Sequence, residues 1–109
     1  MIEKHSESEI LAMIKTSLDV GHYVILPHAR LRCQERKVLP RDIEVVLKKG
    51  KRIKSRDRFD PFYHTWSYVF EGKTIEERDL RVVIIINDKL QIVTVVILEH
   101  DWKMERNYG

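Results

Sequence analysis

Apolar residues recur with helical spacing near the start of the chain. Between Ser6 and Val20 they fall at i, i+3, i+4 and i+8, which places them on one stripe and predicts an amphipathic helix. Ser6 and Glu9 have the spacing of a capping box, and Gly21 supplies a C-terminal cap. We interpret this helix as scaffold rather than as part of a site. The stripe consists of Ile10, Met13, Ile14 and Leu18.

Two shorter helices are predicted next, in tandem. The first begins at Pro27 and runs to about Lys37, and the second begins at Pro40 and ends at Gly50. Proline fits the first turn of a helix, and glycine suits the left-handed position after the last turn. Residues 22–26 form a short extended piece before these helices, because the residue that precedes a proline avoids helical geometry.

The second half of the chain alternates with a period of two residues, which is typical of strands. The pattern predicts a strand or extended arm over 51–60 with four cations on one side, namely Arg52, Lys54, Arg56 and Arg58. Residues 64–70 place Trp66, Tyr68 and Phe70 on one side of a second strand. Two nearly continuous apolar strands, 80–86 and 90–98, are joined by a tight hairpin at 87–89.

Helices that precede an antiparallel sheet in the chain predict an α+β fold. We expect three N-terminal helices packed on a C-terminal antiparallel sheet of about four strands. At 109 residues the chain is one domain, with residues 1–5 and 102–109 expected to fray. The hydrophobic fraction of 43% suffices for one core.

Composition narrows the functional class. The single cysteine, Cys33, excludes an intrachain disulfide and a thiolate metal cluster, which fits a reducing, cytoplasmic location. The first residues are polar and acidic, unlike a signal peptide, and no apolar run approaches the roughly 18 residues of a membrane span. The five histidines are scattered without metal-ligand spacing, so we expect no metal and no other cofactor.

Positive charge is concentrated in one segment. From Arg30 to Arg58 there are 12 Lys/Arg and 4 Asp/Glu, a net charge of +8, whereas the remaining residues hold 8 basic and 13 acidic side chains, a net charge of −5. A segmental surplus can form one face of high potential, for which a polyanion is the natural partner. The nucleic-acid-binding candidates are Lys51, Arg52, Lys54, Arg56 and Arg58.

A cationic row is predicted on the helix that begins at Pro27. His28, Arg32 and Arg36 are spaced four residues apart and therefore line one helix face, beside a packing face with Ala29. Histidine suits proton transfer because its unperturbed pKa lies near 6.5. Arginine suits phosphate because its planar fork matches two oxygens at once.

These residues belong to the pattern H-A-x-x-R-x-x-x-R followed by P-x-D-I-x-x-V-L-x-x-G, spanning 28–50. The pattern, together with W-S-Y-V-F-E-G-K-T at 66–74 and L-R-V-V-I-I-I at 80–86, resembles an uncharacterised bacterial family, one of the domains of unknown function. That family is grouped with RelE/ParE-like toxins, near the MqsR-type messenger-RNA interferases. The resemblance, from about residue 10 to 98, implies the toxin fold, RNA as substrate and a cognate antitoxin protein as partner.

The reaction implied by that grouping is metal-independent RNA cleavage, in which the ribose 2′-hydroxyl attacks the adjacent phosphorus. His28 would be the base or acid, and Arg32 and Arg36 would clamp the phosphate. Tyr68 is a candidate second proton donor, and Arg81 a candidate that reaches across the sheet.

Simpler interpretations stand beside this one. His28 can cap its helix, the two arginines can form ordinary surface ion pairs, and the face with Tyr68 can be sheet core. Arg81 can be the polar first residue of a strand. The alternative function is a non-catalytic module that binds nucleic acid or an acidic partner. The catalytic interpretation requires that His28, Arg32 and a sheet residue converge in one concavity.

Overall fold

A computed structural model describes residues 2–98. The chain begins with the helix α1 (Glu7–Asp19), the short strand β1 (Tyr23–Ile25) and two further helices, α2 (Pro27–Arg36) and α3 (Pro40–Lys49). The remaining elements are β2 (Lys51–Arg52), the 3-10 turn η1 (Lys54–Arg56), β3 (Arg58–Asp60), β4 (Thr65–Lys73), β5 (Asp79–Asn87) and β6 (Lys89–Ile97). The predicted α+β class, with the helices before the main sheet, is confirmed.

The helix boundaries follow from local chemistry. Ser6 Oγ accepts a hydrogen bond from the Glu9 amide at 3.2 Å, and the Ser6 amide donates to Glu9 Oε1 at 2.8 Å, so the predicted capping box is present. Gly21 has φ +68° and its amide donates to the Leu18 carbonyl, which confirms it at the end of α1. Prolines occupy the first turns of α2 and α3 as predicted.

The sheet differs from the prediction of about four antiparallel strands. It has six strands and is mixed, with the order β1-β6-β5-β4-β2 and β3 also paired with β4. β1 lies parallel to β6, with Tyr23 opposite Leu90, whereas the other pairs are antiparallel. Three residues of β1 carry too little pattern to reveal a partner 67 positions away, which is why the sequence shows only an extended piece.

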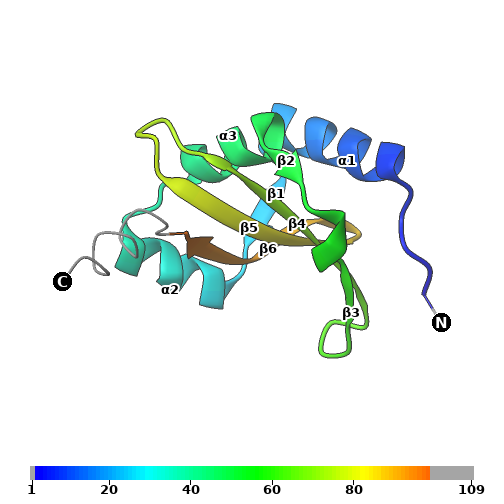
Figure 1. Cartoon of the computed structure of the whole chain (residues 1–109). Helices are drawn as coiled ribbons and strands as arrows, with labels where there is room; N and C mark the ends of the chain where they lie inside the picture. The colour runs from blue at the N-terminus through cyan, green and yellow to red at the C-terminus, as the bar shows by residue number, and fades with distance from the viewer. Residues whose placement is uncertain (1, 99–109) are drawn as a thin grey trace.

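The core lies between the sheet and the helices. In Figure 1, α1 and α3 lie above the sheet, and α2 lies at the lower left beside β6. Ala29 and Cys33 of α2 belong to the same buried core as Ile10 of α1 and Ile43 of α3. α3 contacts β4 and β5, α2 contacts β6, and α1 contacts α3 and β6. Tyr68, Phe70 and Leu80 are among the fully or almost fully buried side chains. Burial of each large apolar side chain contributes about 1.5–3 kcal/mol, so this layer supplies most of the stabilisation.

The prediction of one strand or extended arm over 51–60, with four cations on one side, is wrong. The structure divides it into two short strands that flank the 3-10 turn η1, so its cations do not share one strand face. The reason is the bidentate pair between Arg52 and Asp57, at 2.6 and 2.7 Å, because side chains five residues apart meet only if the chain folds back between them.

Two further expectations differ in detail. Gly50 follows α3 as predicted, but with φ −80° it is extended rather than left-handed, and its role is to permit close approach to β4. At the N-terminus, the Ile2 carbonyl accepts a hydrogen bond from Trp66 Nε1 at 3.1 Å, and Lys4 pairs with Asp57 at 2.9 Å. These contacts argue against fraying of residues 2–5, while 102–109 lie outside the described residues.

Candidate nucleic-acid interface

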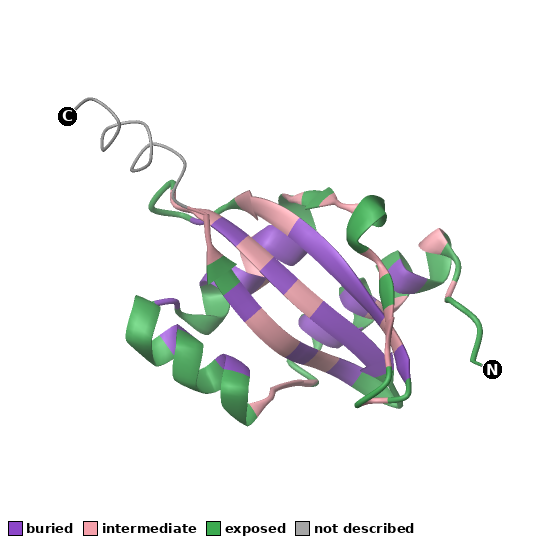
Figure 2. Cartoon of the chain, turned by 60° about the horizontal axis from the view of Figure 1, so that its bottom comes forward, coloured by how far each residue is buried: buried purple, intermediate pink, exposed green. Residues whose placement is uncertain are grey.

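One face of the sheet is not covered by α1 and α3. Figure 2 shows this face forward, with α2 along one side of it. A groove of about 330 Å³ lies there, bordered by η1 and β3 and floored by β4, β5 and β6. The small side chains of Ser67 and Val69 are buried in the floor, and the polar and charged lining residues are Arg56, Arg58, Asp60, Ser67, Arg81 and Thr94.

Three arginines give the groove its charge. Arg81 Nε lies 2.7 Å from Glu71 Oε2, directly across the strand pair, so this cation is neutralised by its neighbour. Arg56 and Arg58 are exposed, and within residues 2–98 neither has an ion-pair partner. Two unpaired guanidinium groups at the edge of a groove are suited to phosphate, whose oxygens they can grip in pairs.

An exposed aromatic side chain lies on the hairpin whose residues Arg58 and Asp60 line the groove. Phe62 is 80% exposed at the tip of the β3–β4 hairpin, between the two segments 51–60 and 64–70 that the sequence predicts as extended. Asp60 Oδ1 accepts hydrogen bonds from the amides of Phe62 and Tyr63, at 2.9 and 3.3 Å, and these bonds fix the turn. The Phe62 and Tyr63 rings meet edge to face at 4.8 Å. A phenylalanine inside a polar turn is the sequence signal that would have found it.

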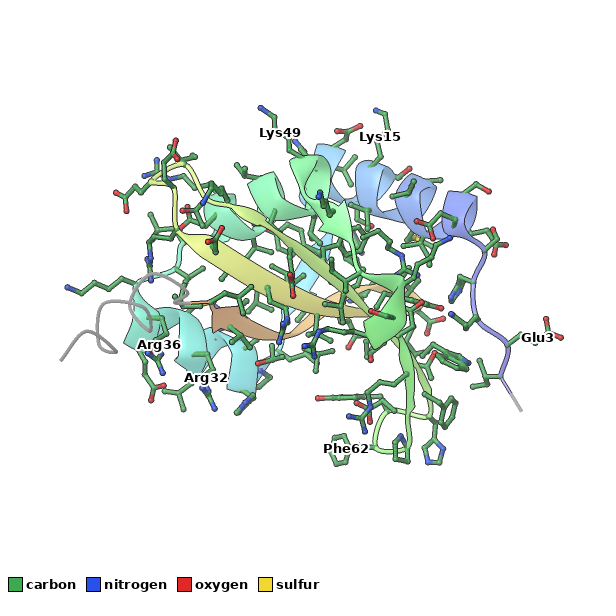
Figure 3. The ribbon with its side chains drawn as sticks, viewed as in Figure 1. Glu3, Lys15, Arg32, Arg36, Lys49 and Phe62 are labelled. Carbon is green, nitrogen blue, oxygen red and sulfur yellow. The ribbon has the colours of Figure 1, made fainter. Side chains whose placement is uncertain are left out.

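The row on α2 is exposed as its spacing indicates. His28, Arg32 and Arg36 lie on the solvent side, while Ala29 and Cys33 are buried against the core. No ion pair joins any of the row's three side chains to another residue of the described chain. In Figure 3, Arg32 and Arg36 lie at one edge of the uncovered sheet face, and Phe62 lies toward the other edge. The row therefore borders this face, at a distance from the groove arginines.

Tyr68 does not join the other candidate catalytic residues. It is fully buried on the helix-facing side of β4, where its hydroxyl accepts a hydrogen bond from the His5 amide at 2.9 Å. Burial raises the pKa of Tyr68, and the Arg52 guanidinium lies 5.2 Å from its ring centre. Arg81, by contrast, lies on the uncovered face with the groove. The structure therefore brings Arg81 to Arg56 and Arg58, and places Tyr68 in the core.

The residues of the predicted basic arm do not form one nucleic-acid-binding surface. Arg52 points inward, with 10% of its side chain exposed, and pairs with Asp57, whose side chain is 2% exposed. Its Nε also lies 3.3 Å from Glu7 Oε1. Lys51 and Lys54 are exposed, and Lys54 lies 3.9 Å from the same Glu7 oxygen. Arg52 is thus a structural cation, and the groove retains Arg56 and Arg58 from the predicted set.

The buried pair predicts a pH dependence of stability. Burial raises the pKa of Asp57, but hydrogen bonds from Arg52 and Lys4 outweigh it, and the pKa ends below its usual value. A depressed carboxyl pKa stabilises the fold above the unfolded-state pKa of about 3.9, and this contribution is lost as the pH falls through and below it. In urea titrations, wild type is expected to be more stable than Asp57→Asn at pH 6, with the difference narrowing at pH 3. If the difference in unfolding free energy between wild type and Asp57→Asn does not narrow on acidification, the lowered pKa of Asp57 is contradicted.

The described residues contain no cluster of three or more His, Cys, Asp or Glu side chains that could hold a metal ion. No helix in residues 2–98 is long and apolar enough to cross a membrane. A family model described as "Domain of unknown function (DUF4258)" matches residues 25–97, from β1 to the end of β6. No curated protein and no solved structure matches the chain.

Proposed function

The chain belongs to the DUF4258 family, and from the groove on its uncovered sheet face we propose that it binds single-stranded RNA. The observation that carries the proposal is the position of Arg56 and Arg58, two exposed guanidinium groups on the groove border that have no ion-pair partner among residues 2–98. Cations that do not pair within the protein keep their affinity for phosphate, which dominates binding to nucleic acids.

A single strand fits this surface better than a duplex. Phe62 presents an exposed ring two residues from the groove-lining Asp60, on a turn that Asp60 holds in place. Unpaired bases stack on such rings, and each stacked base contributes about 1–3 kcal/mol, whereas paired bases keep their faces inside the helix. The choice of RNA rather than DNA is part of the proposal and rests on the sequence resemblance to the MqsR-type messenger-RNA interferases.

Replacement of both groove arginines is expected to weaken RNA binding. The variant Arg56→Ala/Arg58→Ala removes two phosphate partners, so we expect at least about tenfold lower affinity for RNA. The slope of log K against log salt concentration should become shallower by about 1.4, because each phosphate contact to a single strand contributes about 0.7. Fluorescence anisotropy with a labelled 12-nucleotide oligouridine at several salt concentrations measures both quantities. The same oligonucleotide in a duplex should bind more weakly to wild type.

The matched control is Lys15→Ala/Lys49→Ala, which removes the same charge from the opposite side of the molecule (Figure 3). It should reduce affinity only slightly, through net charge. Equal losses in the two double variants would show that binding follows overall charge and not the groove. Absence of binding by folded wild type at about 0.05 M salt, where phosphate contacts are strong, would reject the proposed function.

A second candidate function is metal-independent ribonuclease activity of the messenger-RNA interferase type, within a toxin–antitoxin pair. It is favoured by the exposed, unpaired row on α2, which borders the uncovered face on the side opposite the hairpin. His28 would transfer the proton, and Arg32 and Arg36 would hold the phosphate. The groove that contains Arg81 is lined by none of these three residues, so the convergence with a sheet residue that the catalytic interpretation requires is not met there. Tyr68 is not part of this proposal, since its hydroxyl is committed within the core.

Induced expression in a bacterial host tests this second function. Wild type is expected to arrest growth and shorten transcripts, and His28→Ala/Arg32→Ala is expected to abolish both effects because it removes the base and one phosphate clamp. His22→Ala/Lys15→Ala serves as the control, since it removes a histidine and a cation from exposed positions elsewhere. If folded wild type leaves RNA intact and growth unchanged while still binding oligouridine in vitro, RNA binding stands without catalysis.

A further inference from the structure

A second hollow lies away from the groove and shares no residue with it. It encloses about 610 Å³ between α2, the 37–39 hinge, the first turn of α3 and the loop that connects β4 to β5. Its apolar lining includes Ile25, Cys33 and Val38. Leu39 on the hinge and Ile75 on the loop are 49% and 58% exposed. Two large apolar side chains are thus left in water at the border of an apolar hollow, an arrangement typical of a contact surface.

The border of the hollow is positively charged. Arg30, Lys37 and Arg41 line it, all three are exposed, and none has an ion-pair partner in the part of the chain that the structure describes. Asp42 also lines the hollow, but its Oδ2 already accepts a hydrogen bond from the Leu39 amide at 2.9 Å. The other acidic side chain is Glu76, so the lining carries three cations and two carboxylates, a net positive charge.

The hollow is held in shape by contacts beneath it. Arg78, at the end of the β4–β5 loop, donates hydrogen bonds to the carbonyls of Arg36 and Lys37, at 2.6 and 3.0 Å. Thr74 is buried, and its hydroxyl accepts a hydrogen bond from the Arg78 amide. These bonds fix the loop that carries Ile75 to the end of α2. A surface that is already ordered loses less entropy when a partner binds.

From this combination we propose that the hollow docks an acidic peptide segment of a partner protein. A large apolar side chain of the segment seats between Leu39 and Ile75, and flanking carboxylates pair with Arg30, Lys37 and Arg41. A small ligand on the floor would leave the two protruding apolar side chains in water, whereas a chain segment covers them and reaches all three cations. An apolar centre with an ionic border is the usual anatomy of protein interfaces. The proposal is independent of RNA binding.

The test uses the full chain and a random 12-residue peptide library displayed on phage. Enriched peptides are expected to carry at least two Asp or Glu residues around one Leu, Phe or Trp. By fluorescence anisotropy, Ile75→Asp should raise the Kd of the consensus peptide at least about tenfold, because a carboxylate replaces the apolar contact and repels the peptide. Arg41→Ala should raise it several-fold. Val20→Ser, at an apolar position that is 69% exposed and lies outside the hollow, should leave it unchanged.

Ile75 and Arg41 are exposed, so both variants should retain the wild-type circular dichroism spectrum. The proposal is overturned if no peptide is enriched, if enriched peptides lack acidic residues, or if they bind Ile75→Asp as tightly as wild type. Saturable binding of decanoate without any enriched peptide would assign the hollow to a small amphipathic anion instead. Dimerisation that Ile75→Asp abolishes would assign it to a second copy of the chain, which also overturns the proposal.

Discussion

Arg52→Ala is expected to lower the free energy of unfolding by about 3 kcal/mol. Removing one partner of a buried ion pair leaves the other charge uncompensated, which costs about 3–5 kcal/mol. Asp57, whose side chain is 2% exposed, would lose its bidentate partner and keep a single contact to Lys4 at 2.9 Å. Because Lys4 compensates part of the charge, we place the effect at the lower end of that range. The guanidinium also packs on the rings of Tyr68 and Phe70, and those contacts are lost as well.

Urea denaturation at pH 7 measures this effect, with Lys54→Ala as the control. Lys54 lies two residues away in the same basic segment, but its side chain is 68% exposed, so its loss should change stability by less than about 0.5 kcal/mol. The double variant Arg52→Met/Asp57→Leu removes both charges and should recover most of the lost stability. A change below about 0.5 kcal/mol for Arg52→Ala would contradict the buried character of the pair.

Gly50→Ala is expected to destabilise the fold by a similar amount, about 3 kcal/mol, the upper end for overpacking. A methyl group at this position would lie 2.5 Å from two backbone carbonyl oxygens, those of Val46 and Glu71. Neither oxygen belongs to a side chain that could turn aside, so the end of α3 and β4 would have to separate. The sequence pointed to this glycine for its backbone conformation, whereas the structure requires it for space.

Thermal unfolding checks this expectation, since a loss of about 3 kcal/mol lowers the Tm of a domain of this size by more than about 10 °C. Gly72→Ala is expected to act in the same direction, because its methyl group would lie 2.9 Å from the Gly50 Cα. Gly21→Ala is the control: it has φ +68° and no atom within 4 Å, so it should cost only about 1–2 kcal/mol of backbone strain. A larger loss at Gly21 than at Gly50 would contradict the steric explanation.

The two large effects illustrate a limit of sequence patterns. Period-two alternation placed Arg52 beside Arg56 and Arg58 as one basic face, although Arg52 is buried and the other two border the groove. A pattern records which residues can share a face of a regular strand. It does not record that an acidic residue five positions later will break the strand by pairing with the first cation.

Only part of the candidate site could be predicted from the sequence. The exposed row of His28, Arg32 and Arg36 follows directly from helical spacing, and its solvent position agrees with the structure. Tyr68 alternates with core aromatic residues, and alternation alone cannot tell which side of a strand faces the helices. Phe62 and the hollow beside Ile75 gave no periodic signal, because both lie in loops whose positions are set by distant contacts.

By itself, the sequence determined the three helices and their ends, the hairpin at 87–89 and the apolar strands of the core. These features rest on neighbours within about four residues, through caps, prolines and side-chain periodicity. Tertiary structure alone decided that β1 joins the sheet parallel to β6, that Arg52 turns inward, and that Arg56 and Arg58 meet Arg81 at one groove. Each of these depends on packing between segments that lie apart in the chain, and the energy of such contacts is absent from any local pattern.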